Sequence, residues 1–198
     1  MAHYIIFGDS IAQGFNDLTG GWVQRLRESL TLDDYVFNLG VSGDTSDSLL
    51  ARFEAELKPR LSTEGEANYI LIAIGSNDSA FNHQLNQGWV PVEKYQSNLL
   101  QLIKTGRQFT DKIILISPEP IEQAKVDPIP WEPNLSYRSE LVGKYAAVMG
   151  KIAGEEKLKL VDLFNLLPPE YIRTLADGVH PDAAGHRLIF NLVKNVLK

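Results

Sequence analysis

Residues 3–14 of the chain read HYIIFGDSIAQG. A run of four apolar residues meets Gly8, and the polar residues Asp9 and Ser10 follow at once. A short apolar run that ends at a glycine is typical of a strand buried on both faces of a sheet. We therefore predict a central strand over 3–8, with Ser10 in the turn at the strand's carboxyl end.

The rest of the chain alternates between segments of this kind and amphipathic segments. Strand-helix alternation predicts a parallel sheet with helices on both faces, and five strands in one domain suggest a flavodoxin-like order, 2-1-3-4-5. We take residues 1–198 as a single domain, because the length suits one core and no linker or repeat interrupts it. The other predicted strands cover 35–40, 68–75, 111–118 and 158–164, and the predicted helices cover 20–30, 46–61, 92–109, 135–156 and 182–197.

Composition excludes several classes of function. The formal net charge of -6 argues against a nucleic-acid partner, which requires a basic face to neutralise phosphates. The chain has no cysteine, which removes disulfides, thiolate metal sites and a cysteine nucleophile together. It contains no signal-peptide pattern and no apolar run near the roughly 20 residues of a membrane span. We therefore expect a cytoplasmic location and no integral membrane segment.

The predicted sheet places two unusual loops at one crevice. In doubly wound sheets, ligands bind beyond the carboxyl ends of the strands, where the strand order reverses. With the order 2-1-3-4-5 this point lies between the first and third strands. The sequence GDS (8–10) follows the first strand, and GSND (75–78) follows the third. Both loops should therefore line the same site.

A serine at such a turn has two interpretations. Ser10 could cap the following helix, since serine is a favoured N-cap residue. It could instead be a nucleophile, which requires a base to accept the proton of its hydroxyl. Of the four histidines, His180 fits best, because Asp177 precedes it by three residues and Gly178 lets the chain fold back. An aspartate that accepts from Nδ1–H orients the ring and stabilises its protonated form, although Asp177 and His180 could equally form a turn and a cap.

Acyl transfer also requires donors for a developing oxyanion. The candidates are the backbone N–H of Ser10, the backbone N–H of Gly43 and the side-chain amide of Asn77. Gly43 could instead meet a need for positive φ, and Asn77 could form an Asx turn.

Taken together, four stretches resemble the SGNH hydrolases, also called GDSL esterases or lipases. They occur in the family's order and spacing over nearly the whole chain: GDS (8–10), NLGVSGD (38–44), GSND (75–78) and DGVHPD (177–182). The resemblance implies a three-layer α/β/α sandwich that hydrolyses carboxylic esters or thioesters without a cofactor or metal. It also implies roles for individual residues: Ser10 as nucleophile, His180 as base, Asp177 as the acid that orients it, and Ser10, Gly43 and Asn77 as the oxyanion hole.

Three alternatives to a plain esterase stay open. The same residues could deacetylate carbohydrates or transfer acyl groups to alcohols. A flavodoxin-like scaffold could also be a non-catalytic ligand-binding domain, because fold alone does not give function. An interaction-only module is the third, although no feature of the sequence favours it.

Two long loops, about 76–91 and 118–134, should emerge at the catalytic edge. They carry Phe81, Trp89 and Trp131, which could line an acyl pocket or simply pack the loops onto the core.

Overall fold

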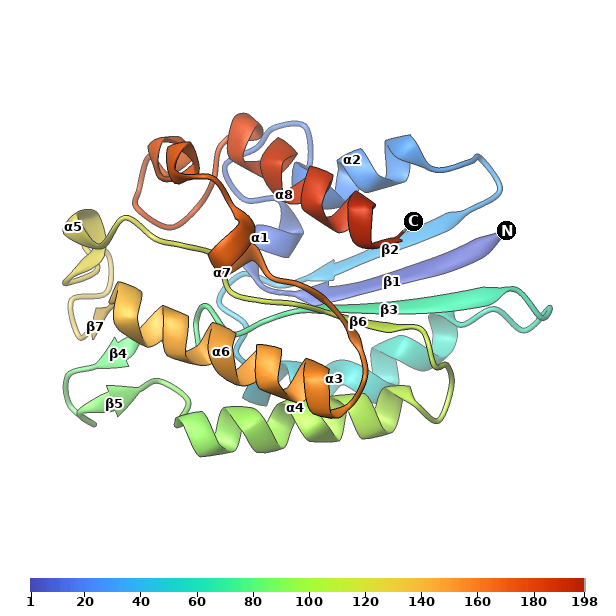
Figure 1. Ribbon diagram of the computed structural model, residues 1–198, viewed down its shortest axis with the longest axis horizontal. Coiled ribbons are helices and arrows are strands. Elements are labelled where there is room, and N and C mark those ends of the chain that lie inside the picture. The colour runs from blue at the N-terminus through green and yellow to red at the C-terminus, as the bar shows by residue number, and fades with distance from the viewer. Residues whose placement is uncertain (198) are drawn as a thin grey trace.

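Five parallel strands form the central sheet, in the order β2-β1-β3-β6-β8. The computed structural model describes residues 1–197 (Figure 1). Numbered among themselves, the five strands have the order 2-1-3-4-5, so the predicted fold class is confirmed. Their bounds are β1 Ala2–Gly8, β2 Tyr35–Gly40, β3 Ala67–Ala73, β6 Ile113–Ile116 and β8 Lys159–Val161.

Strand β1 lies inside the sheet, between β2 and β3, and is buried on both faces. Ile5, Ile6 and Phe7 are fully buried, and they alternate between the two hydrophobic clusters of the core. The register pairs Gly8 with Gly40 of β2 and with Ala73 of β3. The carboxyl ends of the three strands therefore meet at one edge.

Helices cover both faces of the sheet, which gives three layers (Figure 1). One face carries α2 (Gly21–Ser29) and α8 (Ala183–Leu197), and the other carries α3 (Ser46–Leu57), α4 (Val92–Gly106) and α6 (Ser139–Glu155).

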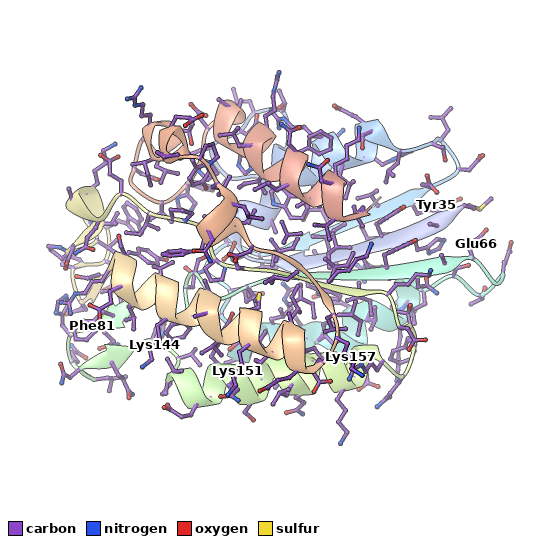
Figure 2. The ribbon with its side chains drawn as sticks, in the orientation of Figure 1. Tyr35, Glu66, Phe81, Lys144, Lys151 and Lys157 are labelled. Carbon is purple, nitrogen blue, oxygen red and sulfur yellow. The ribbon has the colours of Figure 1, made fainter. Side chains whose placement is uncertain are left out.

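Helix α6 shows how helical periodicity directs this packing. Val142, Tyr145 and Met149 recur at spacings of three and four residues and are fully buried. Figure 2 labels Lys144 and Lys151 on the opposite, outward side of the same helix.

The structure departs from the predicted elements in the long loops. The predicted helix over 135–156 begins at Ser139 instead, because β7 (Leu135–Ser136) pairs with β4 (Phe81–Asn82). With β5 (Gln87–Gly88), these strands form a small second sheet in the order β5-β4-β7 beside the carboxyl edge of the main sheet (Figure 1). The short helices are α1 (Ser10–Gln13), α5 (Gln123–Val126) and α7 (Leu163–Leu166), with 3₁₀ turns at Lys58–Arg60 and Pro169–Thr174.

The last predicted strand also ends early. Strand β8 stops at Val161 because the Asp162 side chain accepts from the backbone N–H of Asn165 and so starts α7. Within residues 1–197, no helix has both the length and the apolar character required to cross a membrane.

Candidate active site

In the turn after β1, the Ser10 hydroxyl does not cap the helix that follows. Helix α1 begins at Ser10, and its N-cap is Asp9, whose Oδ1 accepts from the backbone N–H of Ile11 at 3.0 Å. The interpretation of Ser10 as the N-cap is therefore wrong, because Asp9 caps the helix. A glycine is required at position 8, since a Cβ there would lie 2.6 Å from both the Ala12 Cβ and the Ala73 carbonyl oxygen.

A chain of hydrogen bonds joins Ser10 to Asp177 and His180, which lie about 170 residues later in the sequence. The Ser10 Oγ lies 2.9 Å from His180 Nε2, and His180 Nδ1 lies 2.7 Å from Asp177 Oδ2. Asp177 Oδ1 accepts from the backbone N–H groups of Val179 and His180 at 3.0 and 2.8 Å. The turn and the ring contact thus coexist, because each uses a different oxygen of the same carboxylate.

The charge state of Asp177 follows from these contacts. Partial burial alone would raise the pKa of Asp177, but the two backbone N–H groups and the His180 ring together hold the pKa below its usual range. The carboxylate is therefore ionised at neutral pH and accepts from Nδ1–H. That tautomer leaves the Nε2 lone pair facing the Ser10 hydroxyl.

Gly178 makes this turn possible in two ways. Its φ is +93°, in the left-handed region that side chains disfavour. A Cβ at this position would also lie 2.8 Å from side-chain carbons of Lys125 and Val126. The Asp177–His180 turn is therefore packed directly against α5 and the loop that carries it.

Ser10, Gly43, Asn77 and His180 help to line a cavity of about 260 Å³. The N–H groups of Ser10 and Gly43 have no hydrogen-bond partner among residues 1–197. Gly43 has a φ of +83°, and no atom lies within 4 Å of the position of an added Cβ. The interpretation of Gly43 as a positive-φ residue is correct, and its N–H is still available as a donor.

The amide of Asn77 makes two hydrogen bonds with distant parts of the chain. Its Nδ2 donates to the Asp44 carbonyl at 2.9 Å, and its Oδ1 accepts from the Tyr137 hydroxyl at 2.8 Å. The amide makes no bond to its own loop, so the Asx-turn interpretation is wrong. One Nδ2–H remains, and the residue lines the cavity.

Buried polar contacts connect the loop before α3, which contains Gly43, with the loop after β3, which contains Gly75. Asp78 accepts from the backbone N–H of Ser46 at 2.9 Å and from its hydroxyl at 2.5 Å. Burial raises the pKa of Asp78 to about 6 despite these bonds. Arg52 donates to the Asp44 carboxylate and to the Gly8 carbonyl, which ties the start of α3 to the end of β1.

Two buried carboxyl groups, those of Asp9 and Glu119, lie beside the turn after β1. Asp9 and Glu119 are almost fully buried and line a cavity of about 10 Å³, near the volume that one water needs. Burial raises the pKa of both groups, and the negative charge of Asp9 adds to the shift of Glu119. The Ser76 hydroxyl donates to Glu119 at 3.1 Å.

The walls of the larger cavity combine aromatic and aliphatic side chains. Trp89 and Trp131 line it together with Ile129 and Leu135, and both tryptophans remain about half exposed. The structure does not bring Phe81 to this cavity. The centroid of its ring lies 3.8 Å from the Arg138 guanidinium carbon, on strand β4 of the small sheet beside the carboxyl edge of the main sheet (Figure 2).

Four further residues lie in or next to the site, although none of them belongs to a recognisable sequence motif. The Phe15 ring packs against His180 with centroids 4.5 Å apart, and the Asn16 amide lies 3.3 Å from Asp177 Oδ2. His186, buried in α8, donates from Nε2 to the Phe15 carbonyl at 3.0 Å. Only the position of Phe15 and Asn16 in the loop shortly after α1 hinted at their role, and nothing in the local sequence marked His186 or Tyr137.

Sequence and structure comparisons agree with this geometry. The model of the GDSL-like Lipase/Acylhydrolase family matches residues 6–188. The chain belongs to this family. It is 29% identical over 203 residues to the isoamyl acetate-hydrolyzing esterase 1 homolog of Homo sapiens, covering 94% of this chain and 77% of that protein. It is 30% identical over 195 residues to Esterase TesA of Pseudomonas aeruginosa, covering 95% and 84%.

The fold of this GDSL hydrolase also matches solved structures. A catalytic mutant of an acetylxylan esterase from Geobacillus stearothermophilus superposes with a TM-score of 0.75 at 23% identity, over 98% of this chain and 93% of that one. Family membership makes the chain an ester hydrolase of the GDSL type. Among residues 1–197, no three histidine, aspartate or glutamate side chains are placed to share a metal ion.

Proposed function

We propose that the chain hydrolyses small, uncharged carboxylic esters or thioesters through an acyl-enzyme on Ser10. The observation that carries the proposal is the hydrogen-bonded chain from Ser10 Oγ through the His180 ring to Asp177. A serine becomes nucleophilic only when a base takes its proton as it attacks, and this chain supplies that base and the group that orients it.

The first half-reaction forms the acyl-enzyme. Ser10 Oγ attacks the acyl carbonyl carbon while its proton passes to His180 Nε2. The carbonyl oxygen gains the negative charge, and the N–H groups of Ser10 and Gly43 and the Asn77 amide donate to it. Protonated His180, stabilised by Asp177, then gives the proton to the departing alcohol or thiol as the carbon–oxygen or carbon–sulfur bond breaks.

The second half-reaction regenerates the enzyme. His180, neutral again, takes a proton from water, whose oxygen attacks the acyl carbon of the Ser10 ester. The oxyanion of this second tetrahedral intermediate accepts hydrogen bonds from the same three donors. His180 then protonates Ser10 Oγ, and the carboxylic acid leaves.

The cavity supports a compact apolar substrate. Five of the eleven residues that line it have aromatic or aliphatic side chains, the polar side is formed by Ser10, Ser42, Gly43, Asn77 and His180, and Glu132 is the one acidic residue in the lining. At about 260 Å³ it is slightly below the usual range of ligand pockets, which favours short acyl groups over long lipid chains.

A carbohydrate O-acetyl esterase, or an acyltransferase to alcohols, is the second candidate. It is favoured by the half-exposed rings of Trp89 and Trp131, which present flat apolar faces beside the reacting groups. Release of acetate from acetylated xylo-oligosaccharides, compared with p-nitrophenyl acetate, distinguishes this substrate class from simple esters.

The deciding experiment measures hydrolysis of p-nitrophenyl esters, acetate through decanoate, by wild type and Ser10→Ala. We expect turnover by the wild type, highest for short chains, and loss of nearly all of it in the variant. A fluorophosphonate probe should label the wild type on Ser10 alone. If the wild type neither turns over esters nor reacts with the probe, the acyl-enzyme proposal is wrong and a ligand-binding domain is the better description.

A further inference from the structure

The loop between β6 and α6 and the proposed oxyanion donor Asn77 meet at a single hydrogen bond between side chains. Tyr137 follows β7, at the end of the proline-containing loop between β6 and α6. Its side chain is buried, it lines the cavity, and its hydroxyl lies 2.8 Å from Asn77 Oδ1. Its backbone N–H donates to the Val126 carbonyl at 2.8 Å, which anchors it to α5.

The chemistry of the two partners fixes which way the amide of Asn77 faces. The Asp44 carbonyl, 2.9 Å away, can only accept, so the group that faces it must be Nδ2–H. The oxygen of the amide therefore faces Tyr137, and the phenol must donate. In the flipped orientation, Oδ1 would oppose the Asp44 carbonyl, and both would be left without a donor.

From this arrangement we propose that Tyr137 is a positioning residue that holds the Asn77 amide as an oxyanion donor. The inference rests on the proposed function, because it assigns a partner to one of the donors of the proposed oxyanion hole. With Nδ2 bound once to Asp44 and Oδ1 held by Tyr137, the second Nδ2–H has a fixed direction.

The bond to Tyr137 also responds to the reaction. When Nδ2–H donates to the developing oxyanion, electron density in the amide shifts toward Oδ1. A hydrogen bond already made to Oδ1 then becomes stronger, because bonds in a chain polarise one another. Burial raises the pKa of Tyr137, so the phenol keeps its proton as a donor throughout the working range of pH.

Tyr137→Phe tests the proposal because it removes the hydroxyl and keeps the ring in the cavity wall. We expect kcat for p-nitrophenyl acetate to fall about tenfold with KM within about twofold, since the lost interaction acts mainly in the transition state. The matched control is Tyr145→Phe, which removes another buried hydroxyl that donates to a backbone carbonyl, that of Val90, outside the cavity. Its kcat should stay within about twofold of wild type.

A double-mutant cycle separates positioning from cavity shape. Asn77→Ala should cost about 10²–10³ in kcat, as loss of an oxyanion donor does. If Tyr137 acts through Asn77, adding Tyr137→Phe to Asn77→Ala should change kcat by less than about twofold. An equal loss from Tyr137→Phe in both backgrounds, or no loss in the wild-type background, would overturn the proposal.

A measurement independent of turnover completes the test. In Tyr137→Phe, the ¹⁵N–¹H signals of the Asn77 side-chain amide should shift and exchange faster with water, while Tyr145→Phe leaves them unchanged. This readout holds if Asn77→Ala fails to fold. An unperturbed amide in Tyr137→Phe would contradict the proposal, whereas a wild type without esterase activity would contradict the proposed function instead.

Discussion

Asp177 holds His180 by both of its carboxylate oxygens. Oδ2 accepts from ring Nδ1 at 2.7 Å, and Oδ1 accepts from the backbone N–H of the same histidine at 2.8 Å. One carboxylate therefore sets both the path of the loop and the tautomer of the ring. An amide at this position preserves the loop contact, so it should impair catalysis far more than folding.

Asp177→Asn should preserve the loop and lose the chemistry. An asparagine Oδ1 can still accept from the backbone, but its NH₂ cannot accept from Nδ1–H, so the ring loses the partner that stabilises its protonated form. We expect kcat to fall by about three to four orders of magnitude. Thermal unfolding monitored by circular dichroism should show a midpoint within a few degrees of wild type, and a variant that keeps more than a tenth of the activity would contradict the role of Asp177.

Phe15→Ala should loosen the His180 ring without unfolding the protein. The backbone of Phe15 is held by the Ser10 carbonyl and by His186, and these contacts remain in the variant. Loss of the ring that packs against His180 should lower kcat about threefold to tenfold, because small misplacements of catalytic groups are costly. The control is Leu18→Ala, a fully exposed position of the same loop. Similar losses in both variants would show a general effect of the loop.

Trp131→Ala should reduce activity on longer acyl chains more than on acetate. The exposed ring of Trp131 forms the rim of the cavity, so only chains that reach the rim lose contact with it. Each buried methylene contributes about 0.8 kcal/mol, so kcat/KM for hexanoate should fall about tenfold while acetate changes little. Leu32→Ala, at an exposed position between α2 and β2, is the control. An unchanged chain-length profile would remove Trp131 from the proposed pocket.

The main sheet could be predicted because its strands are short apolar runs buried on both faces. Residues 3–8 and 35–40 match β1 and β2 closely, and the strand order is the flavodoxin-like one expected for five alternating strands in one domain. The second sheet could not be predicted. Its strands are two residues long, so no local periodicity reports them, and although β4 and β5 pair locally, β4 also pairs with β7 more than fifty positions away.

The residues of the site likewise include some that the local sequence could indicate and some that it could not. Ser10, Asp177 and His180 lie in short loops at strand or helix ends, where local sequence and residue chemistry are informative. Tyr137 and His186 act through contacts that the tertiary structure alone creates, at separations of 60 and 171 residues. The choice of Asp9 over Ser10 as the cap of α1 also depended on geometry, because both residue types favour that position.

The buried pair Asp9 and Glu119 should make stability fall as pH rises. Burial raises the pKa of both carboxyl groups in the folded state, whereas an unfolded chain gives them ordinary values near 4. Between that value and the raised values, the folded state binds more protons than the unfolded state. The free energy of unfolding then decreases with pH, by up to about 1.4 kcal/mol per pH unit for each proton.

Glu119→Gln isolates this contribution, because glutamine keeps the shape of the side chain and cannot ionise. The free energy of unfolding, measured by urea titration from pH 4 to 9, should fall less steeply with pH in the variant than in wild type. Asp177 contributes with the opposite sign, since its lowered pKa adds stability above pH 4 that is lost as pH falls. Because Asp9 and Asp177 are unchanged in both proteins, the difference between the two curves reports Glu119, and parallel curves would show that burial does not raise the pKa of Glu119.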